Sequence, residues 1–358
     1  MLSLPYSMDP RWVERAKFLV SKARATKTWD QYHCVRRKVE RMEEQYEVDL
    51  SFPWTAEKLN LFICICHEQG LKASSIRSYK SQISSAHALE GFKFIGDSSI
   101  SKFLLQGAAN SEVTKKKRLA VSPYLLRVLK SRLRFCSLEV EDKLMMWSIF
   151  TLLFFGSLRS SELLSKFVNS FGDTTLIGRD VTWTPDSQDG WLSLNLRGPK
   201  EVRGMSSIMV EVLGIEDKNL CPLDAWSRWR RRAETRRPLD PELPVFRFAG
   251  SGKCVTSQFV NSLLKSLLSG DVNYDVHGVL LHSFRAGLVT FLARHGYGEE
   301  QIKVLGRWKS SSWMAYVKLG RGLRRADMRN MGRLVSSSSI TNPGIRIVDE
   351  SDLQVAWQ

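Results

Sequence analysis

The stretch that decides the fold is HSFRAGLVTFLARHGYGEEQIKVLGRWKSSSWMAY, which runs from His282 to Tyr316. From residue 284 its apolar residues recur with helical spacing, and two glycines at 296 and 298 predict where this helix stops. His282 and Arg285 are three residues apart, so we expect them side by side on the flank of the buried face. A second helix is predicted to end at Gly306. A third would bring Tyr316 back towards the basic pair.

The composition is that of a globular protein with a polyanionic partner. The chain has 358 residues, enough for two or three domains, and 43% of them are hydrophobic. Lys and Arg number 53 against 37 for Asp and Glu, and the net charge of +16 indicates nucleic acid as the partner. The six cysteines show neither paired metal spacing nor a dense disulfide framework. We therefore expect reduced thiols in an intracellular protein and no bound metal.

No membrane partner is expected from the apolar segments. The N-terminal residues turn polar too early for a secretory signal. The longest apolar run, from Leu144 to Leu158, is too short to span a bilayer comfortably and is followed by Arg159. It predicts a buried helix.

Residues 10 to 110 predict helices only. One of these helices, KASSIRSYKSQISSAHALEGF, carries Arg77 and Lys80 among several serines. Cations and small hydroxyl groups suit a helix that lies on a phosphate backbone, although a merely solvated polar face has the same composition. The following run TKKKR, residues 114–118, is predicted to be a basic linker that tracks DNA phosphates. Its cations include Lys115, Lys116 and Lys117.

The second half begins with helices at Leu119 and then changes period. Three segments between Asp180 and Val212 alternate apolar and polar residues, with turn residues between them, which predicts a three-stranded antiparallel sheet. The predicted fold class is therefore mainly α with a small antiparallel β-sheet. Arg159 and Glu162 directly follow the apolar helix, where Glu162 would orient the arginine.

Several motifs together resemble one protein family. In chain order they are GSLRSSEL with Arg159, Lys200 in the second turn of the sheet, HSFR with His282 and Arg285, and LGRW followed by WMAYVK with Tyr316. This combination resembles the tyrosine recombinases, also called phage-type integrases. The wording of LGRWKSSSWMAYVK is most similar to recombinases of eukaryotic Crypton and DIRS-like mobile elements.

The resemblance implies a domain plan and a set of partners. Residues 1–113 would form an all-helical core-binding domain, 114–118 a linker, 119–335 an α+β catalytic domain, and 336–358 a tail that docks on a neighbouring subunit. The domains would form a C-shaped clamp on double-stranded DNA. The chain would be a homo-oligomer, a dimer on one site and a tetramer in synapsis. It would be nuclear in a eukaryote and otherwise cytoplasmic with the nucleoid.

The resemblance also implies the chemistry. Tyr316 would attack a DNA phosphodiester and form a 3′-phosphotyrosine without metal, cofactor or ATP. Arg159 and Arg285 would stabilise charge on the phosphate oxygens, because guanidiniums can fork onto them. His282 would assist the phenol, and Lys200 would protonate the leaving 5′-oxygen.

One position departs from the family pattern. The family usually has His or Trp nine residues before the nucleophile, where this chain has Arg307, with Trp308 one residue later. Either Arg307 contacts the phosphate, or Trp308 packs against the nucleophile's helix after a slip of one residue. We favour Trp308.

Two rival functions follow from related chemistry. A type IB topoisomerase uses similar residues to nick and reseal DNA, but that family has Lys where His282 stands. The other rival is a domesticated, inactive DNA-binding protein that retains the fold.

Overall fold

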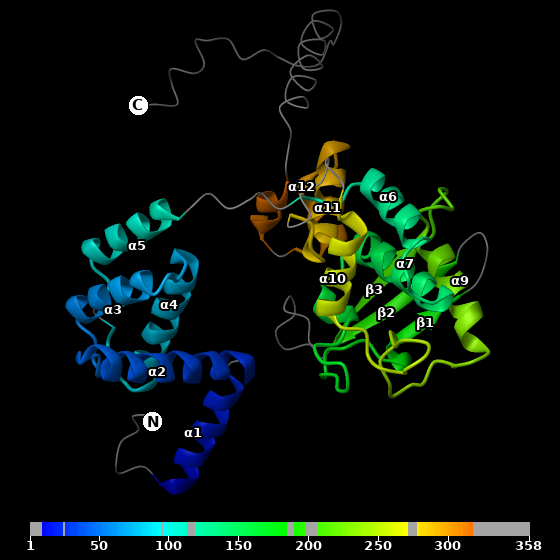
Figure 1. Cartoon of the computed structure of the whole chain (residues 1–358). Helices are drawn as coiled ribbons and strands as arrows, with labels where there is room; N and C mark the ends of the chain where they lie inside the picture. Colours follow the sequence, from blue (N-terminus) through cyan, green and yellow to red (C-terminus); the bar gives the residue numbers. More distant parts are fainter. Residues whose placement is uncertain are drawn as a thin grey trace, which may run out of the picture. The chain divides into compact units, whose positions relative to one another are not determined.

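The computed structural model describes residues 9–23, 26–94, 96–112, 119–184, 190–197, 207–270, 278–308 and 310–317. The chain divides into two compact units, residues 1–115 and 116–358 (Figure 1). The predicted linker, 114–118, and the predicted tail, 336–358, lie outside the described residues. The described elements are mainly helices with one three-stranded antiparallel sheet, which confirms the predicted fold class.

Unit 1 is helical throughout its described part. Its helices are α1 (Pro10–Lys22), α2 (Thr26–Tyr46), α3 (Ala56–Glu68), α4 (Ala73–Leu89) and α5 (Ser99–Ser111). Thr55 caps α3 by accepting a hydrogen bond from the N–H of Lys58. Apolar residues of α2 to α5 and of the loop before α3 form one core, whose largest side chains are Trp54 and Phe62.

His87 is an unusual member of that core, because it is a fully buried ring with two nitrogens. Its Nε2 accepts a hydrogen bond of 2.8 Å from the N–H of Trp54. That backbone group can only donate, so Nδ1 carries the ring proton and donates to the Ile83 carbonyl, also at 2.8 Å. The ring also lies 4.0 Å, centroid to centroid, from that of Phe52. His87 is therefore a neutral residue with every polar atom satisfied.

Unit 2 is built around α7 (Val140–Phe155), which follows α6 (Pro123–Leu133) and precedes the short α8 (Ser160–Leu163). Twelve of the 16 residues of α7 are buried, so the predicted buried helix is confirmed. None of the described helices is long and apolar enough to cross a membrane.

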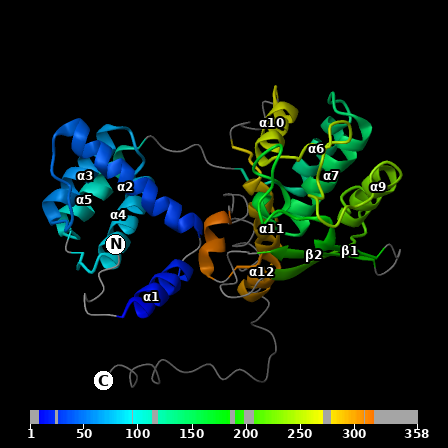
Figure 2. The same cartoon turned by 90° about the horizontal axis from the view of Figure 1, so that it is seen from below.

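The sheet of unit 2 has the predicted strands in the order β1 (Val181–Trp183), β2 (Trp191–Arg197) and β3 (Ser207–Leu213). Both pairings are antiparallel, and Leu194 of β2 lies opposite Val181 of β1 and Val210 of β3. The alternating leucines of β2 are buried in the core of the unit. Helix α9 (Pro222–Glu234) packs on α7 (Figure 2). It also contacts β3.

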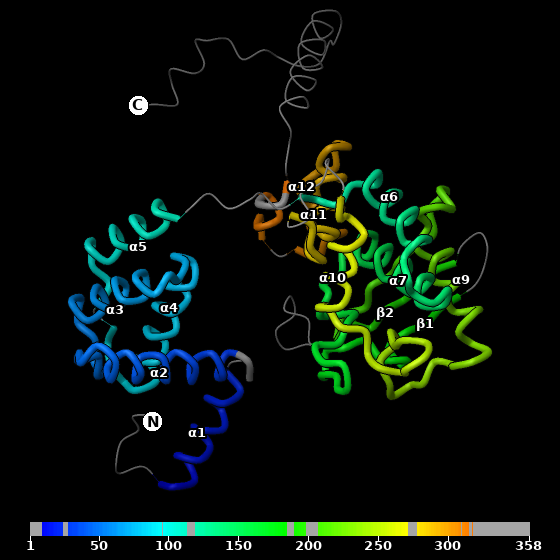
Figure 3. The backbone as a smooth tube through the Cα atoms, in the orientation of Figure 1, coloured from blue at the N-terminus to red at the C-terminus, as the bar shows by residue number. Residues whose placement is uncertain are grey.

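The last described elements are α10 (Ser257–Leu268), α11 (His282–Arg294), α12 (Glu299–Gly306) and η2 (Ser311–Tyr316). The predicted third helix is thus a 3-10 helix rather than an α-helix. Phe284 of α11 stacks on Phe150 of α7, with ring centroids 5.4 Å apart. Both η2 and α12 pack against α11 (Figure 3). The start of α11 is therefore anchored to α7 and flanked by the segments that follow it.

Candidate active site

Three arginines far apart in the sequence meet at the end of α7. Arg285, on the first turn of α11, is 0% exposed. Its Nη1 donates to the carbonyl of Ser157 at 2.7 Å, and its Nη2 donates to the carbonyl of Gly306 at 2.7 Å. Arg307 donates from Nη2 to the same Ser157 carbonyl at 3.1 Å. The guanidiniums of Arg285 and Arg307 therefore share an acceptor.

The predicted position of Arg285 on the flank of α11 was wrong. The arginine lies inside the unit, because the carbonyl groups at the end of α7 and the end of α12 accept its N–H groups. Those carbonyls belong to turns where the helical hydrogen-bond ladder has ended, so their acceptors are available to a side chain. His282, one turn earlier on α11, is half-buried and does lie at the edge.

Glu162 joins the cluster from α8. Its Oε2 accepts from the backbone N–H of Arg159 at 2.8 Å, and its Oε1 accepts from Nη1 of Arg159 at 3.1 Å. The same Oε2 accepts from Nη2 of Arg307 at 2.8 Å. The carboxylate thus orients Arg159, as the spacing of the two residues predicts. The contact of Glu162 with a second guanidinium, that of Arg307, was not predicted from the sequence.

The backbone around the cluster is in an uncommon conformation. Ser157 has φ +46° and Arg307 has φ +54°, and only one other described non-glycine residue, Glu47, has a positive φ. The left-handed region costs an L-residue roughly 1–2 kcal/mol. Such strain persists where surrounding contacts hold it, and it concentrates at functional sites.

Trp308 supports Arg285 from the side. The guanidinium carbon of Arg285 lies 4.6 Å from the ring centroid of Trp308, within the range of a cation–π contact. The close approach depends on Gly306, because a Cβ there would lie 2.4 Å from Cδ1 of the ring. The ring of Trp308 thus faces an arginine of the site, and its predicted packing against the helix of Tyr316 stays a prediction.

The remaining predicted catalytic residues are less fully described. Tyr316 is the last residue of η2, and its side chain lies outside the described part of the structure. The backbone that carries it packs beside α11, the helix of His282 and Arg285. Lys200 lies outside the described residues.

The candidate DNA-binding residues of unit 1 have partners within the unit. Arg77 is exposed and donates from Nη2 to the carbonyl of Leu105 at 3.2 Å. Lys80 pairs with Asp97 at 2.8 Å. Lys115, Lys116 and Lys117 lie outside the described residues. A role in DNA binding stays a prediction for all five.

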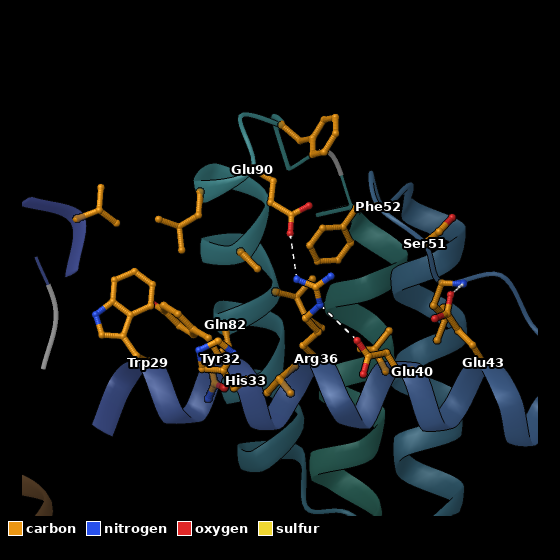
Figure 4. Close-up of a pocket in the computed structure, with 18 residues that line it drawn as sticks. Trp29, Tyr32, His33, Arg36, Glu40, Glu43, Ser51, Phe52, Gln82 and Glu90 are labelled. Carbon is orange, nitrogen blue, oxygen red and sulfur yellow. Dashed lines mark hydrogen bonds and ion pairs between the residues drawn. The ribbon is translucent and has the colours of Figure 1, made fainter. Parts of the chain in front are cut away.

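A cavity of about 650 Å³ lies in unit 1, apart from these residues. It is lined mainly by apolar side chains of α2 and α4 and of the segments at 50–52 and 92 (Figure 4). At its rim Arg36 lies between Glu40, at 3.3 Å, and Glu90, at 3.7 Å. None of the predicted site residues lines it. The described residues also contain no group of three His, Cys, Asp or Glu side chains placed to hold a metal ion.

Comparison with known proteins gives a likeness of fold. No family model and no curated protein sequence matches the chain. The solved structures that match include the Tn1549 transposon integrase in complex with transposon right end DNA, with 15% identity and a TM-score of 0.56 over 88% of this chain and 98% of that one. Two complexes of the same integrase with circular intermediate DNA give TM-scores of 0.53 and 0.50. Both are 16% identical, covering 83% and 82% of this chain and 94% and 91% of the integrase.

The chain shares its fold with the Tn1549 transposon integrase. The likeness includes unit 2, where the three arginines meet, and it extends over most of both chains. The identity is low, so it is the arrangement of helices and sheet that is shared.

Proposed function

We propose that the chain is a site-specific DNA recombinase that cleaves and rejoins DNA through Tyr316. The observation that carries the proposal is the convergence of Arg159 and Arg285, which are separated by more than a hundred residues, through Glu162, Arg307 and Ser157. The fold and the complexes of similar integrases with DNA support it, as does the net charge of +16.

The proposed reaction is a transesterification. The phenol oxygen of Tyr316 forms a bond to phosphorus while the bond from phosphorus to the 5′-oxygen of the deoxyribose breaks. The electron pair stays on that 5′-oxygen, which takes a proton from Lys200, and the phenol proton passes to His282. The product is a 3′-phosphotyrosyl link. A 5′-hydroxyl from a second strand reverses the step and joins the new strand.

Guanidiniums suit the centre of this reaction. A phenol has a usual pKa of about 10, so its attack at neutral pH benefits from cations beside it. Negative charge also grows on the non-bridging oxygens of the phosphate in the transition state. Donors held in place beforehand stabilise that charge without reorganising, and Arg159 and Arg285 are held by Glu162 and by backbone carbonyls.

A cleavage assay on a nicked suicide substrate tests the function. The wild-type chain is expected to form a covalent protein–DNA adduct, and Tyr316→Phe to bind DNA without forming it. Tyr297→Phe is the matched control, because Tyr297 lies between α11 and α12, is 43% exposed and is expected to leave adduct formation unchanged. An adduct that survives Tyr316→Phe would contradict the assignment.

The same assay separates the rival functions. Relaxation of supercoiled DNA without recombinant products would identify a nicking and closing enzyme of the type IB kind. DNA binding with no adduct from the wild-type chain would identify an inactive DNA-binding protein.

We propose further that the protein acts as a homo-oligomer, a dimer on one site and a tetramer in synapsis, through a tail at 336–358. Deleting this segment is expected to reduce assembly on paired sites and to leave binding to a single site intact. Unchanged assembly, measured by light scattering of the DNA complex, would contradict this role of the tail.

The wording of the last motif supports an origin in a Crypton or DIRS-like element, and with it a nuclear location. Cleavage mapping on the ends of the encoding element tests this origin.

A further inference from the structure

The guanidinium of Arg307 is only partly used by the residues around it. Its Nη2 bonds Ser157 and Glu162, whereas Nε and Nη1 are buried and have no hydrogen-bond partner among the described residues. The side chain is 9% exposed. A buried donor without a partner costs about 1–3 kcal/mol, and more when the group is charged. Two such donors on one side chain call for a ligand.

The backbone of Arg307 points the same way. The residue is the C-cap of α12 in the left-handed conformation, a position that favours glycine. An arginine there is strained, and its side chain turns inward to partners that lie 145 and 150 residues earlier in the chain. The conformation thus places a strained, incompletely bonded cation inside the arginine cluster.

The counter-charge is shared. Glu162 bonds both Arg159 and Arg307, so one carboxylate serves two guanidiniums. A buried carboxylate elsewhere in unit 2 shows the balanced case: Asp180 pairs with Arg197 at 3.0 Å. An anion that entered the cluster could accept hydrogen bonds from Nε and Nη1 of Arg307, which have no partner among the described residues.

We propose that Arg307 is a catalytic residue that binds the scissile phosphate beside Arg159 and Arg285. Glu162 is the positioning residue that aligns Arg159 and Arg307, and Trp308 is a positioning residue that supports Arg285. The inference rests on the proposed function. Of the two alternatives that the sequence leaves open for the third motif, it assigns the phosphate contact to Arg307.

The test compares two DNA substrates in single-turnover cleavage. One carries an ordinary phosphodiester at the cleavage site, and the other a methylphosphonate, in which a neutral methyl group replaces one charged oxygen. If Arg307 stabilises charge on that group, Arg307→Met slows cleavage of the phosphodiester by about 10²–10³-fold. On the methylphosphonate the loss is expected to be at most about tenfold, since less charge develops there.

Controls separate chemistry from folding. Arg228→Met removes another arginine paired with a carboxylate in unit 2, Asp224 at 2.8 Å, and is expected to cleave both substrates at the wild-type rate. DNA affinity and melting temperature are measured for every variant. Should Arg307→Met fail to fold, Arg307→Lys keeps a charge at the site and is expected to show the same selective loss on the phosphodiester, with a smaller amplitude.

The outcomes are distinct. A selective loss on the phosphodiester supports the inference. Cleavage at the wild-type rate, or an equal loss on both substrates, would show that Arg307 only clamps the turn, and would overturn the inference while the recombinase function stands. Absence of any adduct from the wild-type chain would overturn the proposed function and this inference with it.

Discussion

The two units each bury one nitrogen-rich side chain completely, and they do so in opposite ways. His87 in unit 1 and Arg285 in unit 2 are both 0% exposed. The two nitrogens of His87 meet one donor and one acceptor, and the ring is neutral. Arg285 donates hydrogen bonds to carbonyl groups, which are uncharged and therefore do not neutralise its positive charge. Arg307 and Arg159 add further positive charge nearby.

This difference separates structural from functional burial. Burial of a polar group is stable where donors match acceptors, as around His87. Beside Arg285, the guanidiniums of Arg159 and Arg307 both bond Glu162, and two donors of Arg307 have no hydrogen-bond partner among the described residues. The buried polar group of unit 1 therefore serves packing, whereas in unit 2 the buried cations form the site that we propose for an anion.

The largest effect on this comparison is expected from His87→Leu. The N–H of Trp54 loses its acceptor and the contact with Phe52 is replaced by a poorer fit, so the free energy of unfolding of unit 1 should fall by about 3–5 kcal/mol. Urea unfolding of the full chain, followed by tryptophan fluorescence, measures it. His33→Leu is the control, because His33 is exposed and its replacement should change stability by under about 0.5 kcal/mol. A loss below about 1 kcal/mol for His87→Leu would show that its hydrogen bonds do not hold the core.

Glu162→Gln is expected to act on the chemistry of unit 2. Glutamine keeps the shape but removes the charge that aligns Arg159 and Arg307, so adduct formation should slow by about 10–100-fold while DNA affinity is kept or raised. Glu234→Gln removes the partner of Arg230 outside the cluster and should cleave normally. Weaker DNA binding by Glu162→Gln, with unaltered cleavage of bound DNA, would contradict the positioning role.

Gly306→Ala tests the support under Arg285. The added Cβ would meet the Trp308 ring, and overpacking of this kind costs about 1–3 kcal/mol. The melting temperature should fall. Gly107→Ala is the opposite case, since Gly107 lies in α5 with open space around its Cβ position, and it should gain about 0.5–1 kcal/mol. Equal melting temperatures for the two variants would mean that the Trp308 ring moves aside freely.

Asp142→Asn is expected to give the smallest change. Burial raises the pKa of the Asp142 carboxyl, although its Oδ1 accepts from the N–H of Ala249 at 2.9 Å. The folded protein therefore binds this proton more tightly than the unfolded chain, so wild-type stability declines as pH rises through the folded pKa. Asparagine keeps the acceptor without the charge and should gain on the order of 1 kcal/mol at pH 7.

The gain from Asp142→Asn should disappear as the pH falls through the raised pKa, which melting curves between pH 4 and 8 would record. Asp217→Asn provides the contrast. The hydrogen bond from Arg127 lowers the pKa of the Asp217 carboxyl, so that charge stabilises the fold at neutral pH and is lost on acidification. A pH-independent gain for Asp142→Asn would mean that burial of its charge is not the cause.

Local periodicity was sufficient for the elements and for one contact of the site. The three strands, the buried α7 and the ends of α11 and α12 follow from side chains a few residues apart, and so does the pair of Arg159 with Glu162. Two other local predictions were less accurate. The segment LPVFRFAGSGKCVT resembles a short strand and a turn, but the structure has isolated bridges there, among them one between Arg247 and Cys254. The helix expected around Tyr316 is a 3-10 helix.

What required the folded chain was the interior of the arginine cluster. Helical spacing places Arg285 near a buried face, but its burial depends on carbonyls 128 and 21 residues away. The inward turn of the Arg307 side chain depends on the left-handed backbone of Arg307 itself. It depends also on Ser157 and Glu162, which come from another part of unit 2. Periodicity reports which face of a helix is apolar, because that depends on neighbours in sequence. Which cations share one carboxylate depends on how separate helix ends meet, and packing alone determines that.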